Sequence, residues 1–270
     1  MATNDDFLFK CKTNDAYIFK ILIELLHNNI KTACFELSRE KIILRMMDSN
    51  RRTLINLNMF SENFNMYHYS KNLETNSINI GVNLNHFYKM IKSVKKKDTM
   101  VLFIEEAKIT DLGIQIIPKD FSRITTSYVK IQNIQNLEIA LPEGYERSIL
   151  VSSNEFSKMC KDMFSMSNNI TISAKKYSIG FMCNVGSVYS REVILGDTES
   201  FSDEPTYQDE YDMEQLSRIS KISGLSSNMT IQCGKNTPLM ITSKVGILGT
   251  ITIFIKSRRQ IEQESIQNDL

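Results

Sequence analysis

An internal repeat constrains the fold of this chain more than any other feature of its sequence. The segments VNLNHFYKMIK (82–92) and VSSNEFSKMCK (151–161) lie 69 residues apart and share six of eleven positions. Residues three apart lie on one face of a helix, so each segment predicts a helix with two lysines on one face. Self-similarity at a fixed offset indicates a duplicated structural unit, here about a quarter of the chain.

The predicted elements repeat in a similar order along the chain. Alternating apolar residues predict about eight short strands in each half. Apolar residues at helical spacing predict two helices in each half, over 16–30, 86–94, 155–165 and 209–225.

A break in this pattern predicts the domain boundary. In QNIQNLEIALPEGY (132–145), Pro142 and Gly144 follow a stretch without a clear period. We therefore expect an α+β protein of two similar domains, with the first over 1–131, a connector over 132–145 and the second over 146–270.

Composition narrows the class of protein. Lys+Arg is 32 and Asp+Glu is 31, so a uniformly basic nucleic-acid binder is excluded, but segregated charge is not. Segment 196–215 has eight carboxylates and no Lys or Arg, which shows that charge is segregated. The N-terminal sequence lacks the pattern of a signal peptide, and no apolar run is long enough for a membrane span. Five scattered cysteines without a CxxC pair are typical of reduced thiols in an intracellular protein.

Motifs for catalysis, metals or cofactors are not found. The three histidines have no metal-site spacing, and nucleophile-elbow and phosphate-loop patterns do not occur. We therefore expect no metal, no cofactor and no enzyme, although a site assembled from distant residues stays open.

Basic side chains recur on one face of all four predicted helices. An ordinary solvated face is the simpler interpretation for any single helix, but four helices biased alike favour one shared basic surface. Such a surface binds phosphates without reading bases. Its candidate residues are Lys20, His27, Lys89, Lys92, Lys158, Lys161, Arg218 and Lys221.

Several of these blocks resemble proliferating cell nuclear antigen, the eukaryotic DNA sliding clamp. The resemblance runs from about residue 7 to residue 256 and is weaker after Gly186. Its most specific parts are the MMDS turn, the GVNL…KxxK block and the EFSKMCKD block. The Asn- and Ile-rich composition and the loose match suggest a divergent member, of the kind a large DNA virus carries.

The resemblance implies a ring of three chains around duplex DNA. Each domain of the family packs two helices against curved antiparallel sheets, and the helices line the pore. The eight basic residues above would then contact DNA independently of its sequence. Glu214 departs from the pattern, because the family often has a basic residue there.

The resemblance also implies a pocket that binds short peptide motifs of polymerases, clamp loaders and other replication and repair proteins. Arg51 and Arg52 depart from the smaller or less charged residues of the family, and the tail KSRRQIEQ is basic where the family tends to be acidic. For Leu54, core packing is the favoured alternative. The pocket candidates are Met47, Arg51, Leu54, Ile139, Leu141, Pro142, Pro238 and Ile255.

Ring closure in the family pairs edge strands of neighbouring chains. Segments 127–131 and 180–188 are the candidates, with Tyr128, Val129, Ile131, Phe181, Cys183 and Val185 at the interface. The expected function is a homotrimeric clamp and processivity factor, in the nucleus or at a cytoplasmic site of viral replication. The alternatives are a subunit of a heterotrimeric or checkpoint-type clamp, and a ring-free scaffold or transcription factor on the clamp fold.

Overall fold

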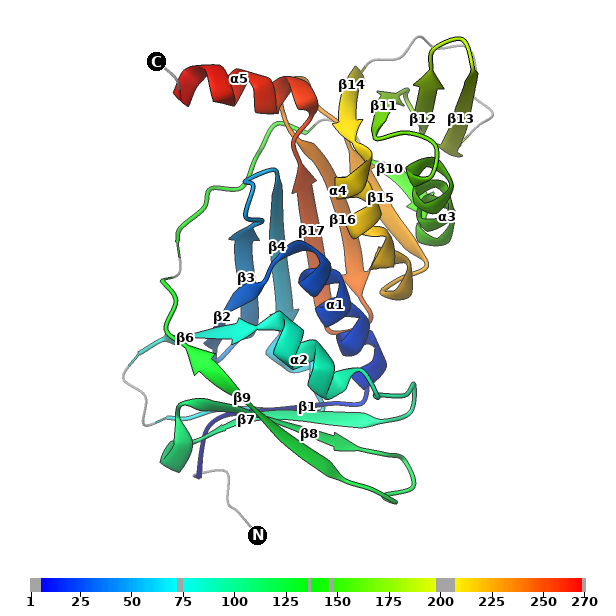
Figure 1. Ribbon diagram of the computed structural model, residues 1–270. Helices are drawn as coiled ribbons and strands as arrows, with labels where there is room; N and C mark the ends of the chain where they lie inside the picture. The colour runs from blue at the N-terminus through cyan, green and yellow to red at the C-terminus, as the bar shows by residue number, and fades with distance from the viewer. Residues whose placement is uncertain (1–5, 72–74, 136, 146–147, 198–206, 269–270) are drawn as a thin grey trace. The chain divides into compact units, whose positions relative to one another are not determined.

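The computed structural model describes residues 6–71, 75–135, 137–145, 148–197 and 207–268 (Figure 1). The chain divides into two compact units that exchange short segments. Unit 1 comprises Met1–Met46, Ile55–Ile139 and Lys244–Ile251, and unit 2 comprises Met47–Leu54, Ala140–Ser243 and Thr252–Leu270.

Unit 1 contains an antiparallel sheet with strand order β5-β1-β7-β8-β9-β6-β2-β3, followed by β4. Strand burial alternates where one face is covered, as in β1, whose pattern is strictly buried and half-buried in turn. The elements are β1 (Phe7–Thr13), α1 (Ala16–Asn29), β2 (Thr32–Ser38), β3 (Lys41–Met47), β4 (Thr53–Phe60), η2 (Ser61–Asn63), β5 (Met66–Tyr69), β6 (Ser77–Asn83), α2 (Leu84–Ile91), β7 (Thr99–Glu105), η3 (Glu106–Lys108), β8 (Asp111–Ile117) and β9 (Thr125–Gln132).

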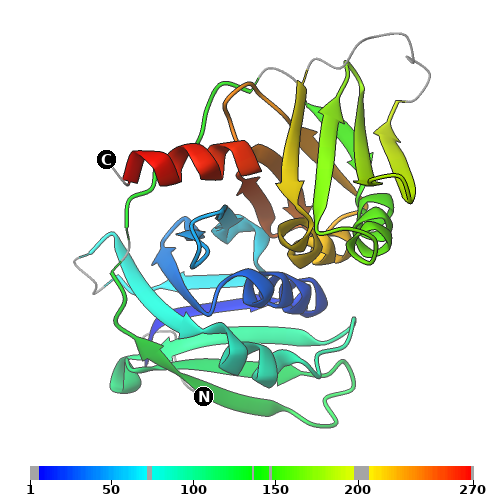
Figure 2. The ribbon, with the colours of Figure 1, turned by 45° about the horizontal axis from the view of Figure 1, so that its top comes forward.

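The two helices of unit 1 lie side by side against its strands (Figure 2). Phe19 of α1 and Phe87 of α2 are both almost fully buried, and their ring centroids are 6.0 Å apart. Further along α1, the ring of His27 stacks on that of Tyr88, with 5.7 Å between the centroids. The predicted apolar face of each helix therefore forms the core, and the polar faces remain at the surface.

Unit 2 contains two sheets, with strand orders β10-β15-β16-β17 and β13-β12-β11-β14. Helices α3 and α4 lie next to each other, and a further helix, α5, contacts β14. The elements are β10 (Ile149–Ser152), α3 (Ser153–Phe164), β11 (Asn169–Ala174), β12 (Ser178–Val185), β13 (Tyr189–Gly196), β14 (Tyr207–Asp212), α4 (Met213–Arg218), η4 (Ser220–Gly224), β15 (Asn228–Gln232), β16 (Leu239–Val245), β17 (Gly249–Ile255) and α5 (Arg258–Asn268).

The sequence repeat has a matching local structure in both units. The side chain of Asn83 accepts a hydrogen bond from the backbone N–H of His86 at the start of α2. Ser152, 69 residues later, accepts the same bond from Glu155 at the start of α3. Both are strand residues that cap the following helix, so the repeat is a strand–cap–helix unit.

The fourth predicted helix needs a correction. Residues 207–212 form strand β14, which pairs with β11 from Asn169↔Asp212 to Ala174↔Tyr207. The helix starts only at Met213, because the carboxylate of Asp212 caps it by accepting the backbone N–H of Glu214. It ends at Arg218 and continues as the short 3-10 helix η4, so the predicted single helix is two short ones.

Helix α5 was not expected from the sequence. This helix is polar on all sides, so it has no apolar face that could pack against the rest of the chain. Ser257 and Gln260 form a reciprocal capping box at its start. Arg258 pairs with Glu210 at 3.7 Å and Arg259 pairs with Asp209 at 2.9 Å, so charges on β14 fix the first turn of the helix.

Neither a membrane helix nor a reactive thiol is found in the described part of the chain. None of its helices is long and apolar enough to cross a membrane, and none of its His, Cys, Asp and Glu residues form a group of three that could hold a metal. All five cysteines are free. Burial raises the pKa of Cys11 and Cys233 to about 12, so these thiols stay protonated and unreactive at neutral pH.

Candidate nucleic-acid interface and docking surfaces

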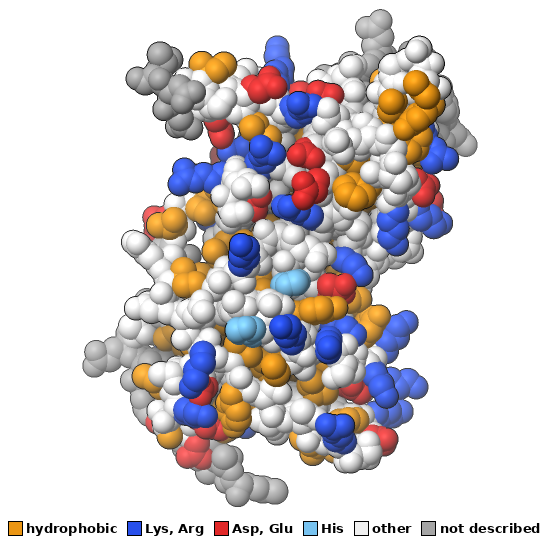
Figure 3. Space-filling view, viewed as in Figure 1, with side chains coloured by type: hydrophobic (Ala, Val, Ile, Leu, Met, Phe, Trp, Pro, Cys, Tyr) orange, Lys and Arg blue, Asp and Glu red, His pale blue; other side chains and the backbone are white. Residues whose placement is uncertain are grey.

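The helix pair of unit 1 presents a basic surface. Lys89 and Lys92 are exposed, at the end of α2 and one residue beyond it. Lys20 of α1 is half-buried, and its Nζ donates a hydrogen bond to the carbonyl of Val94 at 3.2 Å. His27 is half-buried by its stacking on Tyr88. Figure 3 shows Lys, Arg and His side chains gathered where α1 and α2 lie.

Helix α3 of unit 2 carries the second lysine pair. Lys158 and Lys161 are exposed on the turns of the helix. Lys158 Nζ is 2.7 Å from the carboxylate of Glu155, one turn earlier. Both side chains are more than half exposed, so this pair is weak and exchangeable. Lys158 therefore stays available to a phosphate, which would compete for the same ammonium group.

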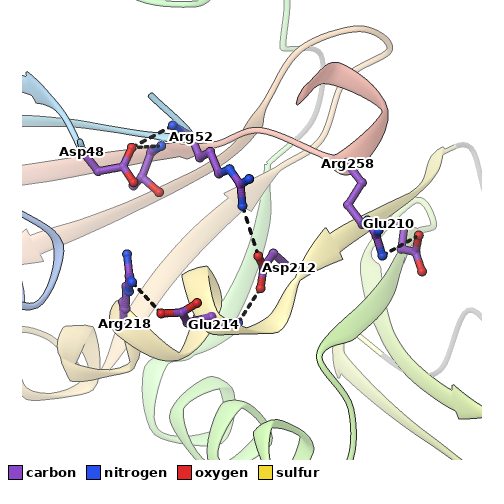
Figure 4. Close-up of polar contacts among 8 residues, drawn as sticks. Asp48, Arg52, Glu210, Asp212, Glu214, Arg218 and Arg258 are labelled. Atoms are coloured by element: carbon purple, nitrogen blue, oxygen red, sulfur yellow. Dashed lines mark hydrogen bonds and ion pairs between the residues drawn. The ribbon is translucent and has the colours of Figure 1, made fainter. Parts of the chain in front are cut away.

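One of the two basic residues of the fourth helix is also in an ion pair. Arg218 of α4 forms an ion pair with Glu214 at 2.5 Å (Figure 4). Asp212, which caps α4, also accepts a hydrogen bond from Arg52 at 3.5 Å. Lys221 lies on η4 and is exposed. The acid at position 214, which departs from the family pattern, thus pairs with Arg218 and reduces the positive charge on this helix.

Four of the pocket candidates lie half-buried in unit 2: Met47, Leu141, Pro142 and Pro238. Tyr145 helps to fix the last of these, because its hydroxyl donates to the carbonyl of Pro238 at 2.7 Å. Burial raises the pKa of the Tyr145 phenol, so the donor proton stays in place at neutral pH.

The remaining pocket candidates differ in character. Leu54 is 4% exposed and Ile255 is fully buried, so both are core positions that a peptide cannot reach. Arg51 is exposed in the turn between β3 and β4, with a positive φ of 55°. Ile139 belongs to unit 1, where its carbonyl accepts a hydrogen bond from Arg45 Nη1 at 3.1 Å.

Strand β9 has one edge that is unpaired over most of its length. Residues 125–130 pair with β8, whereas β6 pairs only with Ile131 and Gln132 on the other side. Tyr128 is 46% exposed and Ile131 is half-buried, but Val129 points into the core. Exposed apolar residues continue into the preceding loop, with Phe121 at 71% and Ile124 at 53%.

The expected edge role of residues 180–188 needs a correction. Strand β12 pairs with β11 on one side and with β13 on the other, so it lies inside its sheet. Phe181 and Cys183 are fully buried, and Val185 is half-buried at the end of the strand. The outer strands of this sheet are β13 and β14, and β13 is outer because residues 189–196 fold back on β12 as a hairpin. No feature of either strand alone distinguishes the edge from the interior.

Taken together, these units have the architecture of a DNA sliding clamp: helix pairs packed on antiparallel sheets, with lysines on exposed helix faces. Comparison with known proteins gives the family. Residues 8–139 match the family description "Proliferating cell nuclear antigen, N-terminal domain", and residues 140–258 match "Proliferating cell nuclear antigen, C-terminal domain". The chain therefore belongs to the proliferating cell nuclear antigen family.

Individual relatives agree with this assignment. Proliferating cell nuclear antigen of Chaetomium thermophilum is 24% identical over 248 residues, covering 88% of this chain and 93% of the relative. The crystal structure of Proliferating Cellular Nuclear Antigen from Entamoeba histolytica has a TM-score of 0.81 at 20% identity, covering 93% of this chain and 99% of that one. The chain is thus a sliding clamp of this family.

Proposed function

We propose that this clamp is a processivity factor without catalysis of its own, and that it acts as a homotrimeric ring around duplex DNA. The observation that carries the proposal is the repeated strand–cap–helix unit, which places exposed lysines at matching positions on α2 and α3. Lysines on helix faces attract phosphates but do not read bases. Contacts of this kind centre a duplex and still allow sliding.

For ring closure, we propose that β9 of one chain pairs with β13 of the next. Residues 125–130 of β9 have an unpaired edge, and β13 is one of the two outer strands of its sheet. Tyr128 on β9 and Tyr189 on β13 are exposed by 46% and 41%. Strand addition would provide hydrogen-bond partners for the unpaired backbone groups of both edges, which otherwise favour aggregation. The heterotrimer stays an alternative because such an edge accepts a related chain equally well.

For partner binding, we propose that polymerases, clamp loaders and other proteins with short peptide motifs dock on Met47, Leu141, Pro142 and Pro238. The support is that these four half-buried apolar residues belong to one unit, where the Tyr145 hydrogen bond holds the carbonyl of Pro238. Arg51, exposed in the adjoining turn, would favour partners with acidic flanks.

The native mass of the chain and its binding to DNA with open or blocked ends test this proposal. Three chains of 31.1 kDa give about 93 kDa by light scattering. A closed ring threads onto a short linear duplex from its ends, so streptavidin on both biotinylated ends should prevent binding. Equal binding to open and blocked duplexes would contradict encirclement. A monomer at all concentrations would favour a heteromeric clamp or a ring-free scaffold.

Charge reversal separates the pore contacts from unspecific attraction. A pore variant with Lys89, Lys92, Lys158 and Lys161 replaced by Glu should bind an open 30-bp duplex at least tenfold more weakly. Its affinity should also depend less steeply on salt, by about 0.9 in the log–log slope for each lost contact. The control reverses four exposed cations elsewhere: Arg39, Lys71, Lys176 and Lys235. Equal loss in both variants would contradict the pore assignment.

The proposed location is the nucleus or a cytoplasmic site of viral replication. A viral source stays a prediction, which rests on the Asn- and Ile-rich composition.

A further inference from the structure

Unit 1 contains a second basic surface that the four helices do not account for. Two loops, one between α2 and β7 and one between β8 and β9, line a groove of about 990 Å³. Strand pairing brings these loops together, because Thr99↔Ile117 sets the register of β7 and β8, and Ile116↔Thr125 sets that of β8 and β9. Five cations line this basic groove: Lys95, Lys96, Lys97, Lys119 and Arg123.

The two carboxylates in the groove are used to fold the loops. Asp98 is 7% exposed, and its Oδ2 accepts the backbone N–H of Lys95 at 2.9 Å. Asp120 Oδ1 accepts both the backbone N–H and the hydroxyl of Ser122, at 3.1 and 2.7 Å. These hydrogen bonds from Ser122, with a smaller effect of the charge on Lys95, lower the pKa of Asp120, so it stays ionised.

Most cations of the groove have no partner within the described part of the chain. Lys96 lies over the ring of Tyr17, with Nζ 5.9 Å from the ring centroid. Lys95, Lys97, Lys119 and Arg123 form no hydrogen bond or ion pair through their side chains there, and all four are exposed. Unpaired like charges around one concave surface repel one another and raise the local positive potential, so they favour a polyanion.

The composition of the groove selects among polyanions. No aromatic ring lines it, so it has no stacking platform for bases, and its apolar lining is limited to Ile116 and Pro118. Its lining thus offers few apolar anchors for a protein partner, and the exposed Phe121 and Ile124 of the same loop are not part of that lining. The groove also begins three residues after Lys92, so five of the nine residues 89–97 are lysines that run from helix α2 into the groove. A continuous basic path of this kind follows a sugar–phosphate backbone.

We propose that the basic groove binds the sugar–phosphate backbone of DNA, as an extension of the contacts made by α2. The inference rests on the proposed function for its choice of nucleic acid as the ligand. The groove adds up to five phosphate contacts per chain outside the helices. It would increase the salt dependence of binding and prolong the time that the clamp stays on DNA.

A variant that neutralises four cations tests the proposal. The groove variant carries Lys95→Gln, Lys97→Gln, Lys119→Gln and Arg123→Gln, and leaves Lys96 on Tyr17. The control variant also replaces three lysines and one arginine, but outside the groove: Arg39→Gln, Lys71→Gln, Lys176→Gln and Lys235→Gln. Binding to a fluorescent 30-bp duplex is measured by anisotropy between 50 and 300 mM salt, in the full-length protein. Light scattering checks the mass of each variant.

The proposal predicts that the groove variant keeps the wild-type mass, binds at least tenfold more weakly at low salt, and has a log–log salt slope smaller by about 2–4. The control variant should stay close to the wild type. The proposal is overturned if groove and control variants share one affinity and slope. It is also overturned if the groove variant loses its assembly, which would assign the groove to a contact between copies.

Two further results keep this test separate from that of the proposed function. Failure of wild-type binding, or full binding by the pore variant, would count against the proposed function. A weakened pore variant beside an unaffected groove variant would overturn only the groove. Competition with poly-glutamate identifies an acidic polypeptide as the ligand: if it binds the wild type and not the groove variant while duplex binding is equal in both, the phosphate assignment is wrong.

Discussion

Replacing Thr126 by proline tests the proposed ring closure at one backbone group. The N–H of Ile131 donates to the carbonyl of Thr110 at 2.8 Å, so it points from β9 towards β8. Successive N–H groups of a strand point to opposite sides, and no irregularity interrupts the register between β8 and β9. The N–H of Thr126, five residues earlier, therefore points to the free edge. Proline removes that donor and leaves the hydrogen bonds to β8 in place.

The magnitude follows from the symmetry of a closed trimer. Each interface loses one backbone hydrogen bond, with a net contribution of about 1 kcal/mol. Three interfaces per ring give about 3 kcal/mol, which is about 150-fold in the equilibrium between trimer and separate chains. The proline ring also hinders the approach of the neighbouring strand, so this value is a lower bound. The chain itself loses only the exposed hydrogen bond from Gln115 Nε2 to the Thr126 hydroxyl.

Sedimentation equilibrium over a concentration series, together with thermal unfolding, provides the measurement. Thr126→Ala is the matched control, because it removes the same hydroxyl and keeps the N–H. Val129→Pro is the opposite control: its N–H points to β8, so this change should lower the melting temperature of the chain itself. We expect Thr126→Pro to dissociate at higher concentration than Thr126→Ala while unfolding at a similar temperature. Identical dissociation of the two variants would show that the free edge of β9 does not close the ring.

Two other predictions concern the pocket and the stability of unit 1. Leu141→Glu should weaken binding of a partner's motif peptide at least tenfold, because it places a charge among apolar side chains. Fluorescence titration measures the affinity, and light scattering checks that the native mass is unchanged. A variant with wild-type affinity would contradict the pocket assignment. Hydrogen bonds from Lys108 at 2.8 Å and Lys130 at 2.6 Å hold the pKa of the Asp111 carboxyl below its ordinary 3.8. Its stabilising effect should therefore be full above that value and be lost as the pH falls through the lower pKa of the folded state. The melting temperatures of wild type and Asp111→Asn should differ at pH 7 and converge below about pH 4, and a constant difference would contradict this assignment.

The sequence predicted the elements of this fold well where local pattern decides them. The helix pattern over 16–30 corresponds to α1. The repeat at 69 residues correctly placed α2 and α3, because the buried Phe87 and Phe156 and the caps before them are fixed by local chemistry. In each case the hydrophobic period and the cap residue indicate the same structure.

Elements held by distant partners were harder to predict. The segment YQDEYD has strand-like alternation within a helix-like context, and only its pairing with β11 makes it β14. Strand β6 likewise depends on its neighbour, because SINIGVN is mixed in polarity and is paired along its whole length with β2. Helix α5 has no apolar stripe, yet its S-x-x-Q capping box at Ser257 and Gln260 was a readable signal.

Edges and grooves depend on which segments meet, which a strand pattern does not contain. Strands β12 and β13 differ little in local character, but the hairpin between them makes one interior and one outer. The basic groove likewise needs two loops about twenty residues apart, joined by the register of β7 and β8. The run Lys95–Lys97 was a visible signal for half of it, and Lys119 and Arg123 were not distinguishable from ordinary loop charges.

The positions of charged residues indicate that the two units contribute unequally to DNA binding. In unit 2, Glu155 and Glu214 lie one turn from Lys158 and Arg218, so a phosphate that binds there must displace an ion pair. In unit 1, the basic stretch of residues 89–97 contains no acid. A duplex should therefore be held mainly by unit 1, through α2 and the basic groove, while unit 2 supplies weaker contacts that exchange as the DNA moves. On this basis, reversing only the α2 lysines should reduce duplex affinity more than reversing only the α3 lysines.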